Sequence, residues 1–383
     1  MSSKNYEVSS MKLIYIANAR LPTEKAHGAQ VMNMCGAFAR AGAHVTLLVP
    51  RRWGNRIVAE PFHYYGLLKN FKLVKLPCID FVWTEMKWAF FLEELTFMIS
   101  WRLYLLLHQK DVVYARDPFV PFLGWSIWAK IVFEAHTKPM RMLFRRKIFL
   151  VRVHNVVAMT SFIRDRYLAW GMRQERILIA PDAVDTALFA ELRRQRSDFR
   201  GQMNVERRKV ISYVGQLHTM GMEKGIRNLL MAFAKIFMAH NDATLFIVGG
   251  PHTHVAGYRA LAHELGIDGR VRFVDQVPPR SAACYEVISD VLVAPSPKTD
   301  FFMYDASPMK IFEYRATGRP IVVSDMPAMR EAVGDYPNAI FVEPENPDAL
   351  ARGLVTALDM GQVVDESIPT WDDRARAVLD FIK

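Results

Sequence analysis

The segment 305–325 places the tightest limits on how this chain can fold, because it contains a complete loop, helix, turn and strand. Ser307 suits a helix N-cap, and Pro308 suits the first helical position, where its missing N–H costs no hydrogen bond. Gly318 is the residue type expected at the end of a helix, and the apolar run 321–323 indicates a buried strand. A short helix followed directly by a buried strand is typical of alternating α/β folds.

The start of this helix has the features of an anion-binding site. The N–H groups of Met309 and Lys310 have no carbonyl partner within the helix and lie at the positive end of its dipole, where a phosphate binds well. The Lys310 ammonium is unfavourable there by roughly 0.3–1 kcal/mol unless an anion accompanies it. Asp305 and Glu313 bracket the position and can accept hydrogen bonds from sugar hydroxyls. These residues alone leave open an ordinary capped helix with solvated acids.

The remaining sequence alternates strands and helices in two halves. Strand-like apolar runs lie at 12–17, 44–49, 111–116 and 131–134, and another set begins at 209–214. A chain of 383 residues is long enough for two domains with separate cores. We therefore expect an α/β protein with two Rossmann-like βαβ domains, whose ligands bind at the carboxyl ends of the strands.

Composition and missing motifs narrow the function classes. The three cysteines, Cys35, Cys78 and Cys284, have no disulfide or metal-ligand spacing, which favours a reducing cytosol. The chain lacks a D-x-D sequence and a G-x-G-x-x-G sequence, so we expect neither a carboxylate-held metal nor a nicotinamide or flavin cofactor. Its net charge of +10 suits an anionic membrane or a phosphorylated substrate. Without a zinc-finger or RNP-like motif, nucleic acid is not an expected partner.

Asp305 and Glu313 are eight positions apart, and the surrounding segment resembles the carboxylate–seven residues–carboxylate signature of family-4 glycosyltransferases. That family has a glutamate where this chain has Asp305, and a loop glycine where it has Pro308. The resemblance spans nearly all of 11–383. It implies the GT-B fold, in which two Rossmann-like domains face each other across a cleft and the second domain holds most of a nucleotide-sugar.

The resemblance also implies a domain plan. Residues 1–10 would be a disordered lead, and 11–190 would form the N-terminal, acceptor-side domain. The charged run 191–208 would be the linker. Residues 209–365 would form the nucleotide-sugar-binding domain, and 366–383 would be a terminal helix that crosses back to the N-terminal domain.

The loop after 209–214 contains the residues that the resemblance predicts to contact the diphosphate. Lys224 matches a family lysine that contacts the diphosphate, whereas Gln216 stands where the family has an arginine. One charge-assisted contact, worth roughly 1.5–3 kcal/mol, is therefore missing from its usual place. Three nearby cations are candidates to replace it: Arg20, His218 and Lys310.

The resemblance assigns the other donor contacts as well. The backbone near Val277 would meet the nucleotide base, Glu313 would accept the ribose hydroxyls, and Asp305 would accept a hydroxyl of the donor sugar. The remaining expected donor-binding positions belong to the helix start described above: Ser307, Met309 and Lys310.

Two residues of the first half complete the predicted site. Gly28 opens a helix after a strand and a loop, and the resemblance places this loop, with His27, near the donor phosphates or the acceptor. His136 follows the strand at 131–134, where a family histidine lines the cleft beside the reacting sugar. We expect His136, Lys224, Asp305 and Glu313 to be the catalytic residues. A plain surface loop and a structural histidine are the ordinary alternatives.

Two segments suggest contact with a membrane. The helix expected over 88–107 is apolar almost all round, which favours a buried helix, with insertion into a membrane surface as the alternative. Glu93, Glu94 and Arg102 argue against a membrane span. The segment 138–152 mixes basic and apolar residues and contains no acid, which suits docking on an anionic membrane.

Together these features predict a glycosyltransferase that moves a sugar from a nucleoside diphosphate sugar to a saccharide or lipid-linked saccharide acceptor. We expect retention of the anomeric configuration, no metal and no separate cofactor. We expect the protein to be cytoplasmic and to associate peripherally with the inner face of the cell membrane. Two alternatives stay open: a sugar-nucleotide epimerase, and a non-catalytic member that only binds nucleotide-sugar or membrane.

Overall fold

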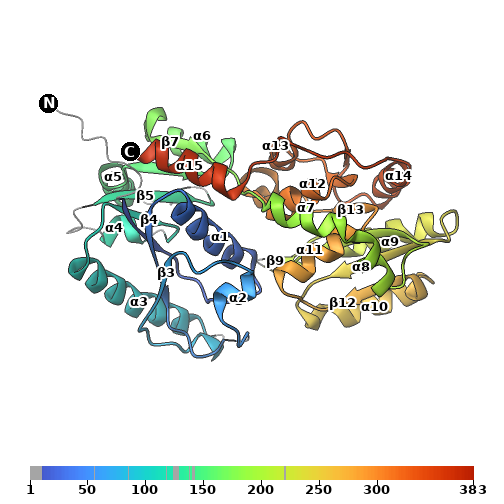
Figure 1. The fold of residues 1–383 in the computed structure, drawn as a ribbon, viewed down its shortest axis with the longest axis horizontal. Coiled ribbons are helices and arrows are strands. Elements are labelled where there is room, and N and C mark those ends of the chain that lie inside the picture. Colours follow the sequence, from blue (N-terminus) through green and yellow to red (C-terminus); the bar gives the residue numbers. More distant parts are fainter. Residues whose placement is uncertain are drawn as a thin grey trace. The chain divides into compact units, whose positions relative to one another are not determined.

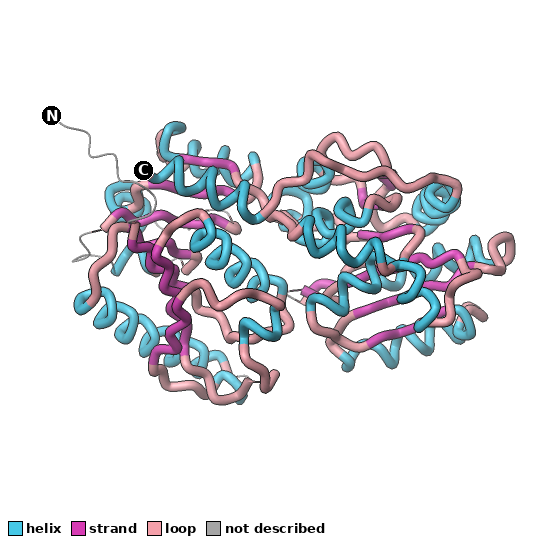
Figure 2. Tube along the Cα trace, in the orientation of Figure 1, coloured by secondary structure: helices cyan, strands magenta, loops and turns pink. Residues whose placement is uncertain are grey.

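The computed structural model describes residues 11–383 except positions 56, 85, 118, 124–128, 138, 140–142 and 220, so the predicted lead at 1–10 lies outside the described residues. The chain divides into two compact units. The first unit contains the chain up to Pro181 together with Trp371–Lys383, and the second unit contains Asp182–Thr370. Each unit is a parallel sheet with helices around it (Figures 1 and 2).

The first unit has a seven-stranded parallel sheet in the order β3-β2-β1-β4-β5-β6-β7. Chain order reverses between β1 and β4, which is the switch point where Rossmann-like sheets bind ligands. Its apolar strands are buried on both faces, as expected for parallel strands under helices. The strands are β1 (Lys12–Ile16), β2 (His44–Pro50), β3 (Lys72–Leu76), β4 (Val112–Ala115), β5 (Lys130–Ala135), β6 (Asn155–Ala158) and β7 (Ile177–Ile179).

Helices cover both faces of this sheet. Seven α-helices belong to the described part of the first unit: α1 (Ala26–Arg40), α2 (Pro61–Tyr65), α3 (Lys87–Leu107), α4 (Val120–Leu123), α5 (Leu143–Arg152), α6 (Ser161–Ala169) and α15 (Trp371–Ile382). The last of these follows the second unit in sequence but packs against α1. The buried Arg374 of α15 donates to the backbone oxygen of Pro181 over 2.8 Å.

The second unit has a six-stranded parallel sheet in the order β12-β11-β8-β13-β14-β15, with a separate two-stranded hairpin of β9 and β10. The sheet strands are β8 (Lys209–Val214), β11 (Ala243–Val248), β12 (Val271–Val274), β13 (Val291–Ala294), β14 (Ile321–Ser324) and β15 (Ala339–Val342), and the hairpin strands are β9 (His218–Thr219) and β10 (Met222–Glu223). Its helices are α7 (Thr186–Arg194), α8 (Arg196–Gln202), α9 (Ile226–Phe237), α10 (Val255–Glu264), α11 (Pro279–Ile288), α12 (Met309–Thr317), α13 (Pro327–Val333) and α14 (Pro347–Leu358).

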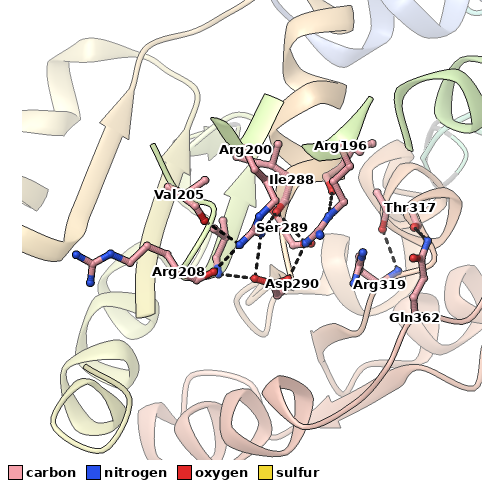
Figure 3. Close-up of polar contacts among 12 residues, drawn as sticks. Arg196, Arg200, Val205, Arg208, Ile288, Ser289, Asp290, Thr317, Arg319 and Gln362 are labelled. Atoms are coloured by element: carbon pink, nitrogen blue, oxygen red, sulfur yellow. Dashed lines mark hydrogen bonds and ion pairs between the residues drawn. The ribbon is translucent and has the colours of Figure 1, made fainter. Parts of the chain in front are cut away.

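The charged run at 191–208, which was predicted to be the linker, is largely helical as far as Gln202 and belongs to the second unit. It forms the end of α7 and all of α8, both of which pack on α11 of the second unit. Arg196 and Arg200 reach the Asp290 carboxylate at 2.6 and 3.2 Å, as Figure 3 shows. Arg200 also donates to the carbonyl of Ile288 over 2.6 Å. These arginines therefore fix α8 to the rest of the second unit, because their guanidinium groups bind the Asp290 carboxylate and the Ile288 carbonyl there.

Candidate functional site

The loops at the carboxyl ends of β8, β11 and β13 touch through their backbones. Gly249 follows β11 with φ +141°, and a Cβ on it would lie 2.0 Å from the carbonyl oxygen of Gly215, which follows β8. Gly225 has φ +78°, and its Cβ would lie 1.8 Å from the carbonyl oxygen of Pro295, which follows β13. Both positions need glycine for space and for conformation. Three strand ends are thereby held together at one place.

Two partly buried lysines lie in this region. The Nζ atom of Lys224 is 5.8 Å from the Phe302 ring centroid, and that of Lys310 is 3.7 Å from the Tyr213 ring centroid. Burial lowers the pKa of Lys224 to about 8, and burial together with the Lys224 charge lowers the pKa of Lys310 well below its usual value. The Lys310 Nζ atom is buried and has no hydrogen-bond partner among the described residues. Two desolvated ammonium groups of this kind favour a bound anion.

Lys310 also lies beside the loop that carries the substituted arginine position. A Cβ on Gly215 would lie 2.8 Å from the Lys310 Nζ atom, so that ammonium group packs directly against the residue before Gln216. The carbonyl of Gln216 accepts a hydrogen bond from the Tyr213 hydroxyl over 2.5 Å. The lysine therefore places an ionisable amine at the loop where Gln216 has none.

Two carboxyl groups, of the partly buried Glu313 and the buried Glu286, share this environment. Burial raises the pKa of Glu313, on α12, to about 7, while the Lys310 charge opposes that rise. Burial and the nearby Glu313 raise the pKa of Glu286, on α11, well above its usual value. Sequence reasoning missed Glu286, which belongs to no motif. Its helical spacing from the buried Ala283 was the available sign that it points inward.

The start of α12 differs in one detail from the sequence expectation. Its N-cap residue is Pro308, and no side chain caps the helix. The prediction that Ser307 is the cap is wrong, because the Ser307 hydroxyl accepts the Asp182 N–H over 3.1 Å instead. The first turn still leaves the N–H groups of Met309 and Lys310 without intrahelical acceptors.

The second unit thus brings some of its predicted residues together. Lys224, Lys310 and Glu313 interact with a common cluster of charges at the carboxyl ends of β8 and β13. Asp305 is buried at the end of the π-helical turn Phe301–Asp305, and Val277 follows β12, the edge strand beside β11.

In the first unit, Gly28 has a packing role. It lies in the first turn of α1, where a Cβ would be 2.3 Å from the Tyr65 hydroxyl oxygen and 2.4 Å from Cγ2 of Thr23. Glycine therefore lets the loop before α1 pack against α2. Burial, with a contribution from Arg116, lowers the pKa of the neighbouring His27 to about 3, so this imidazole is neutral at physiological pH.

His136 is held by a buried carboxylate. Its Nε2 atom lies 2.6 Å from Oε1 of Glu134, and burial, with a contribution from Arg116, lowers the pKa of His136 to about 4. Although burial raises the pKa of Glu134, the charge of Arg374 and the hydrogen bond from His136 lower it well below its usual value. A neutral imidazole beside an ionised carboxylate must carry its proton on Nε2, which leaves Nδ1 as an acceptor.

Glu134 is the centre of a polar network that the sequence did not reveal. It is fully buried on β5 and accepts hydrogen bonds from Gln30 over 2.6 Å and from the Tyr114 hydroxyl over 2.5 Å. Arg374 of α15 completes the network at 3.2 Å. An acid within an otherwise apolar strand, two residues before His136, was the available signal.

A second buried polar cluster lies at the carboxyl ends of β1 and β4. Arg52 contacts Glu93 at 3.1 Å and the Asn18 side-chain oxygen at 2.7 Å. Burial, followed by the neighbouring Asp117, raises the pKa of Glu94 to about 8. The two acids of the predicted apolar helix therefore point into the unit. Across the described residues, no group of three or more His, Cys, Asp or Glu is arranged to hold a metal ion.

Two solved structures with a similar fold show the fold class of this chain. Anabaena HepE, solved in complex with UDP, is similar with a TM-score of 0.66 and 15% identity, covering 97% of this chain and 95% of HepE. WaaG, a glycosyltransferase involved in lipopolysaccharide biosynthesis, is similar with a TM-score of 0.65 and 16% identity, covering 96% of this chain and 95% of WaaG. The fold is therefore GT-B.

Sequence comparisons identify the family. The model described as Glycosyltransferase Family 4 matches residues 28–188, and the model described as Glycosyl transferases group 1 matches residues 208–360. With both halves matched in this way, the chain belongs to the family-4 glycosyltransferases.

The curated relatives match this chain in part. A D-inositol 3-phosphate glycosyltransferase of Corynebacterium efficiens is 30% identical over 194 residues, covering 48% of this chain and 43% of the relative. An uncharacterized glycosyltransferase of Methanocaldococcus jannaschii is 32% identical over 201 residues, covering 49% of this chain and 48% of the relative. The matches therefore span less than half of the length of either relative.

Proposed function

We propose that this protein transfers a sugar from a nucleoside diphosphate sugar to a saccharide or lipid-linked saccharide, with retention of configuration. The observation that carries the proposal is the pair of desolvated lysines, Lys224 and Lys310, beside the start of α12. Desolvated ammonium groups are costly, and a bound anion offsets that cost. The UDP in the HepE structure supports a uridine diphosphate donor as the first candidate.

In the proposed reaction, the second unit stabilises the diphosphate leaving group. Lys224, Lys310 and the N–H groups that open α12 supply fixed positive charge where negative charge develops. Lys310 takes the place of the arginine that Gln216 replaces. We propose that these groups act without a metal ion and that Ser307, Gln216 and Val277 belong to the donor-binding loops.

The carboxyl groups and His136 have separate proposed roles. Glu313 binds the ribose hydroxyls and Asp305 binds a hydroxyl of the donor sugar. His136 is the first unit's contact to the sugar or the acceptor, through the free acceptor nitrogen of its neutral ring. Gly28 and its loop lie near the donor phosphates or the acceptor. No enzymic nucleophile is assigned. The acceptor therefore attacks the donor sugar from the same face from which the leaving group departs.

The proposal for the acceptor rests on the names of relatives and on the basic segment 138–152. One relative is named D-inositol 3-phosphate glycosyltransferase, so a phosphorylated polyol is one candidate acceptor. A lipid-linked saccharide would bring the enzyme to the inner face of the membrane, with 138–152 as a docking segment. Lys138 and 140–142 lie outside the described residues, and the exposed Lys147 and Val151 belong to α5.

Incubation with a panel of nucleotide-sugars, with and without candidate acceptors, tests the proposal. We expect acceptor-dependent release of nucleoside diphosphate. The Lys224→Ala and Glu313→Ala variants should each lower turnover at least about tenfold, because each removes a charged contact to the donor. Lys298→Ala is the matched control, since Lys298 is exposed.

Other outcomes would contradict transfer. Formation of an epimer without an acceptor would indicate a sugar-nucleotide epimerase. Nucleotide-sugar binding without turnover, across all acceptors, would indicate a non-catalytic member. Unchanged rates in both variants would remove this site from the mechanism.

A further inference from the structure

The outer face of α3 is apolar and uncovered. Every side chain on this helix that is exposed among those described is apolar: Trp88, Phe90, Phe91, Leu95, Ile99, Leu103, Leu106 and Leu107. Phe91 is 68% exposed and Leu107 is 81% exposed. Contiguous exposed apolar surface of this kind marks a site of interaction with another molecule or a membrane.

The opposite face of α3 explains why the helix is apolar almost all round. Phe97, Trp101 and Leu105 pack into the core against the sheet of the first unit. The acids Glu93 and Glu94 also point inward and are buried. The expectation of a fully buried helix is therefore wrong for the outer face. In the described part of the chain, α3 included, no helix has the length and hydropathy needed to cross a bilayer.

Exposed aromatic residues extend the apolar face at the start of α3. The rings of Phe81 and Trp88 lie 6.0 Å apart. Trp83 packs beside Gly54, and its neighbour Trp53 is 68% exposed. Tryptophan is the side chain that most favours the boundary between lipid headgroups and hydrocarbon, because its ring is apolar and its N–H is polar.

A basic cavity lies at the other end of α3. It has a volume of about 750 Å³, and Leu107 and His108 at the end of the helix line it. Lys12, Lys69 and Lys72 also line it, and among its lining residues none is acidic. Lys69 is 69% exposed with Glu60 at 3.5 Å, an exposed pair that leaves most of the lysine charge available.

The basic cavity and the buried polar cluster around Glu93 and Glu94 lie at opposite ends of the strands of the first unit's sheet. Lys12, His44 and Lys72 are the first residues of the neighbouring parallel strands β1, β2 and β3. The Glu93 and Glu94 end of α3 instead contacts Asn18, which follows β1. Helix α3 therefore runs from the carboxyl ends of the strands, where Rossmann-like sheets bind ligands, to their amino ends, where the basic cavity lies.

We propose that the outer face of α3 lies on an anionic membrane surface, with its apolar side chains in the interface and lipid phosphates at the basic cavity. A surface that combines a helix-long apolar stripe, tryptophans at one end and lysines at the other matches the chemistry of an anionic bilayer. A second copy of the chain offers no such match, because the exposed, described side chains of α3 include no carboxylate for the lysines. The net charge of +10 also opposes self-association.

Co-sedimentation of the full chain with vesicles tests this proposal independently of glycosyl transfer. One set of vesicles contains phosphatidylcholine alone, and the other contains phosphatidylcholine mixed with phosphatidylglycerol. We expect binding to the anionic vesicles that weakens as salt rises. Phe91→Glu/Leu103→Glu should lower the partition coefficient at least about tenfold, since it places two charges in the apolar stripe. Lys69→Gln/Lys72→Gln should lower it about fivefold or more for each lysine.

Two matched controls separate the surface from general effects of charge. Met238→Glu adds a carboxylate at another exposed apolar position, in the second unit, and Lys209→Gln removes a lysine from the first residue of β8. Both controls should bind vesicles as the unaltered protein does. Circular dichroism checks that each variant is folded. The tryptophan emission of the unaltered protein should shift to shorter wavelength on binding, and Trp88→Phe should reduce that shift.

Three results would overturn the proposal. The unaltered protein could fail to bind anionic vesicles at low salt. The folded Phe91→Glu/Leu103→Glu variant could bind as well as Met238→Glu does. Light scattering could show a dimer that the Phe91→Glu/Leu103→Glu variant abolishes, which would assign the face to a second copy. None of these results depends on turnover, so each is distinguishable from failure of the proposed reaction.

Discussion

Lys224 and Lys310 show how burial changes the chemistry of a side chain. Lys224 lies in the loop before α9 and Lys310 in the first turn of α12, and the sequence predicted both as donor-binding residues. Burial lowers the pKa of Lys224 to about 8, and no charge of a described acidic side chain raises that pKa again. Keeping these amines protonated therefore has a cost in free energy, which a bound anion would offset.

Donor binding should weaken as pH rises through the pKa of Lys224. Below about pH 8 the free amine is already protonated, whereas above it the amine must take up a proton before it can bind a diphosphate. We expect the Kd for uridine diphosphate to increase by up to about tenfold per pH unit above that point. Isothermal titration calorimetry from about pH 6.5 to pH 9.5 measures it.

Lys224→Arg is the control for this pH dependence. A guanidinium group stays protonated throughout the range, so the variant should keep its affinity at higher pH than the unaltered protein does. An identical pH profile in both proteins would show that another group controls binding.

The residues that sequence reasoning predicted differ in kind from those it did not single out. Lys224, Glu313 and His136 were predicted as site residues because each stands at a motif or a strand end. Glu134 and Glu286 were missed because each is a single acid inside an apolar helix or strand. Their roles come from neighbours such as Arg374 and Lys310, which are distant in sequence.

At the scale of elements, the candidate site depends on loops that approach each other without side chains between them. The loops after β8 and β11 meet at Gly215 and Gly249, and the helix start of α12 brings Lys310 to the same place. Adjacent parallel strands put their carboxyl ends side by side, so this juxtaposition follows from strand order.

Gly249→Ala should disturb both the stability and the site of the second unit. A Cβ there would lie 2.0 Å from the Gly215 carbonyl oxygen, and φ is +141°, a conformation that alanine rarely adopts. We expect a loss of about 1–3 kcal/mol in the free energy of unfolding and weaker binding of uridine diphosphate. Far-UV circular dichroism during urea unfolding and calorimetry are the measurements.

Gly257→Ala is the matched control within the same unit. Gly257 lies inside α10, where a Cβ would meet nothing within 4 Å. Replacing a helical glycine by alanine should stabilise the protein by about 0.5–1 kcal/mol and leave nucleotide binding unchanged. Equal effects of the two substitutions would contradict the proposed contact between the loops.

Two elements pack in ways that the sequence did not indicate, for a common reason. The charged run at 191–208 was expected to be a linker, and the apolar helix over 88–107 was expected to be buried. In each case composition indicates how polar a segment is but not which neighbours it meets. Asp290 immobilises the arginines of α8, whereas the outer face of α3 has no covering element among the described residues.

At the scale of the whole molecule, the first unit is assembled from both ends of the chain. Helix α15 returns to the first unit after the chain has formed the second, and its Arg374 is 4% exposed. This arginine contacts Glu134 and the backbone oxygens of Ala180 and Pro181. The network therefore links the central sheet, the end of the first segment and the terminal helix.

Arg374→Met should destabilise the first unit by about 3–5 kcal/mol, because it leaves the Glu134 carboxylate buried without its cation. All eight tryptophans lie before residue 182 or after residue 370, so their fluorescence during urea unfolding reports on the first unit. Arg376→Met is the control, since Arg376 makes an exposed pair with Asp373 at 2.5 Å. It should change stability by less than about 1 kcal/mol. Equal losses in the two variants would show that the buried network does not anchor α15.

The amino-acid sequence was enough to predict the α/β alternation, the two-domain plan and the position of the principal lysine and glutamate motifs. It was enough because strand periodicity, helix stops and short motifs are local properties of the chain. The folded structure was needed to show that Lys310 packs against Gly215, that Glu134 binds Arg374 and that one face of α3 stays uncovered among the described residues. Those outcomes depend on contacts between distant segments, and burial at such contacts sets the charge state and exposure of each side chain.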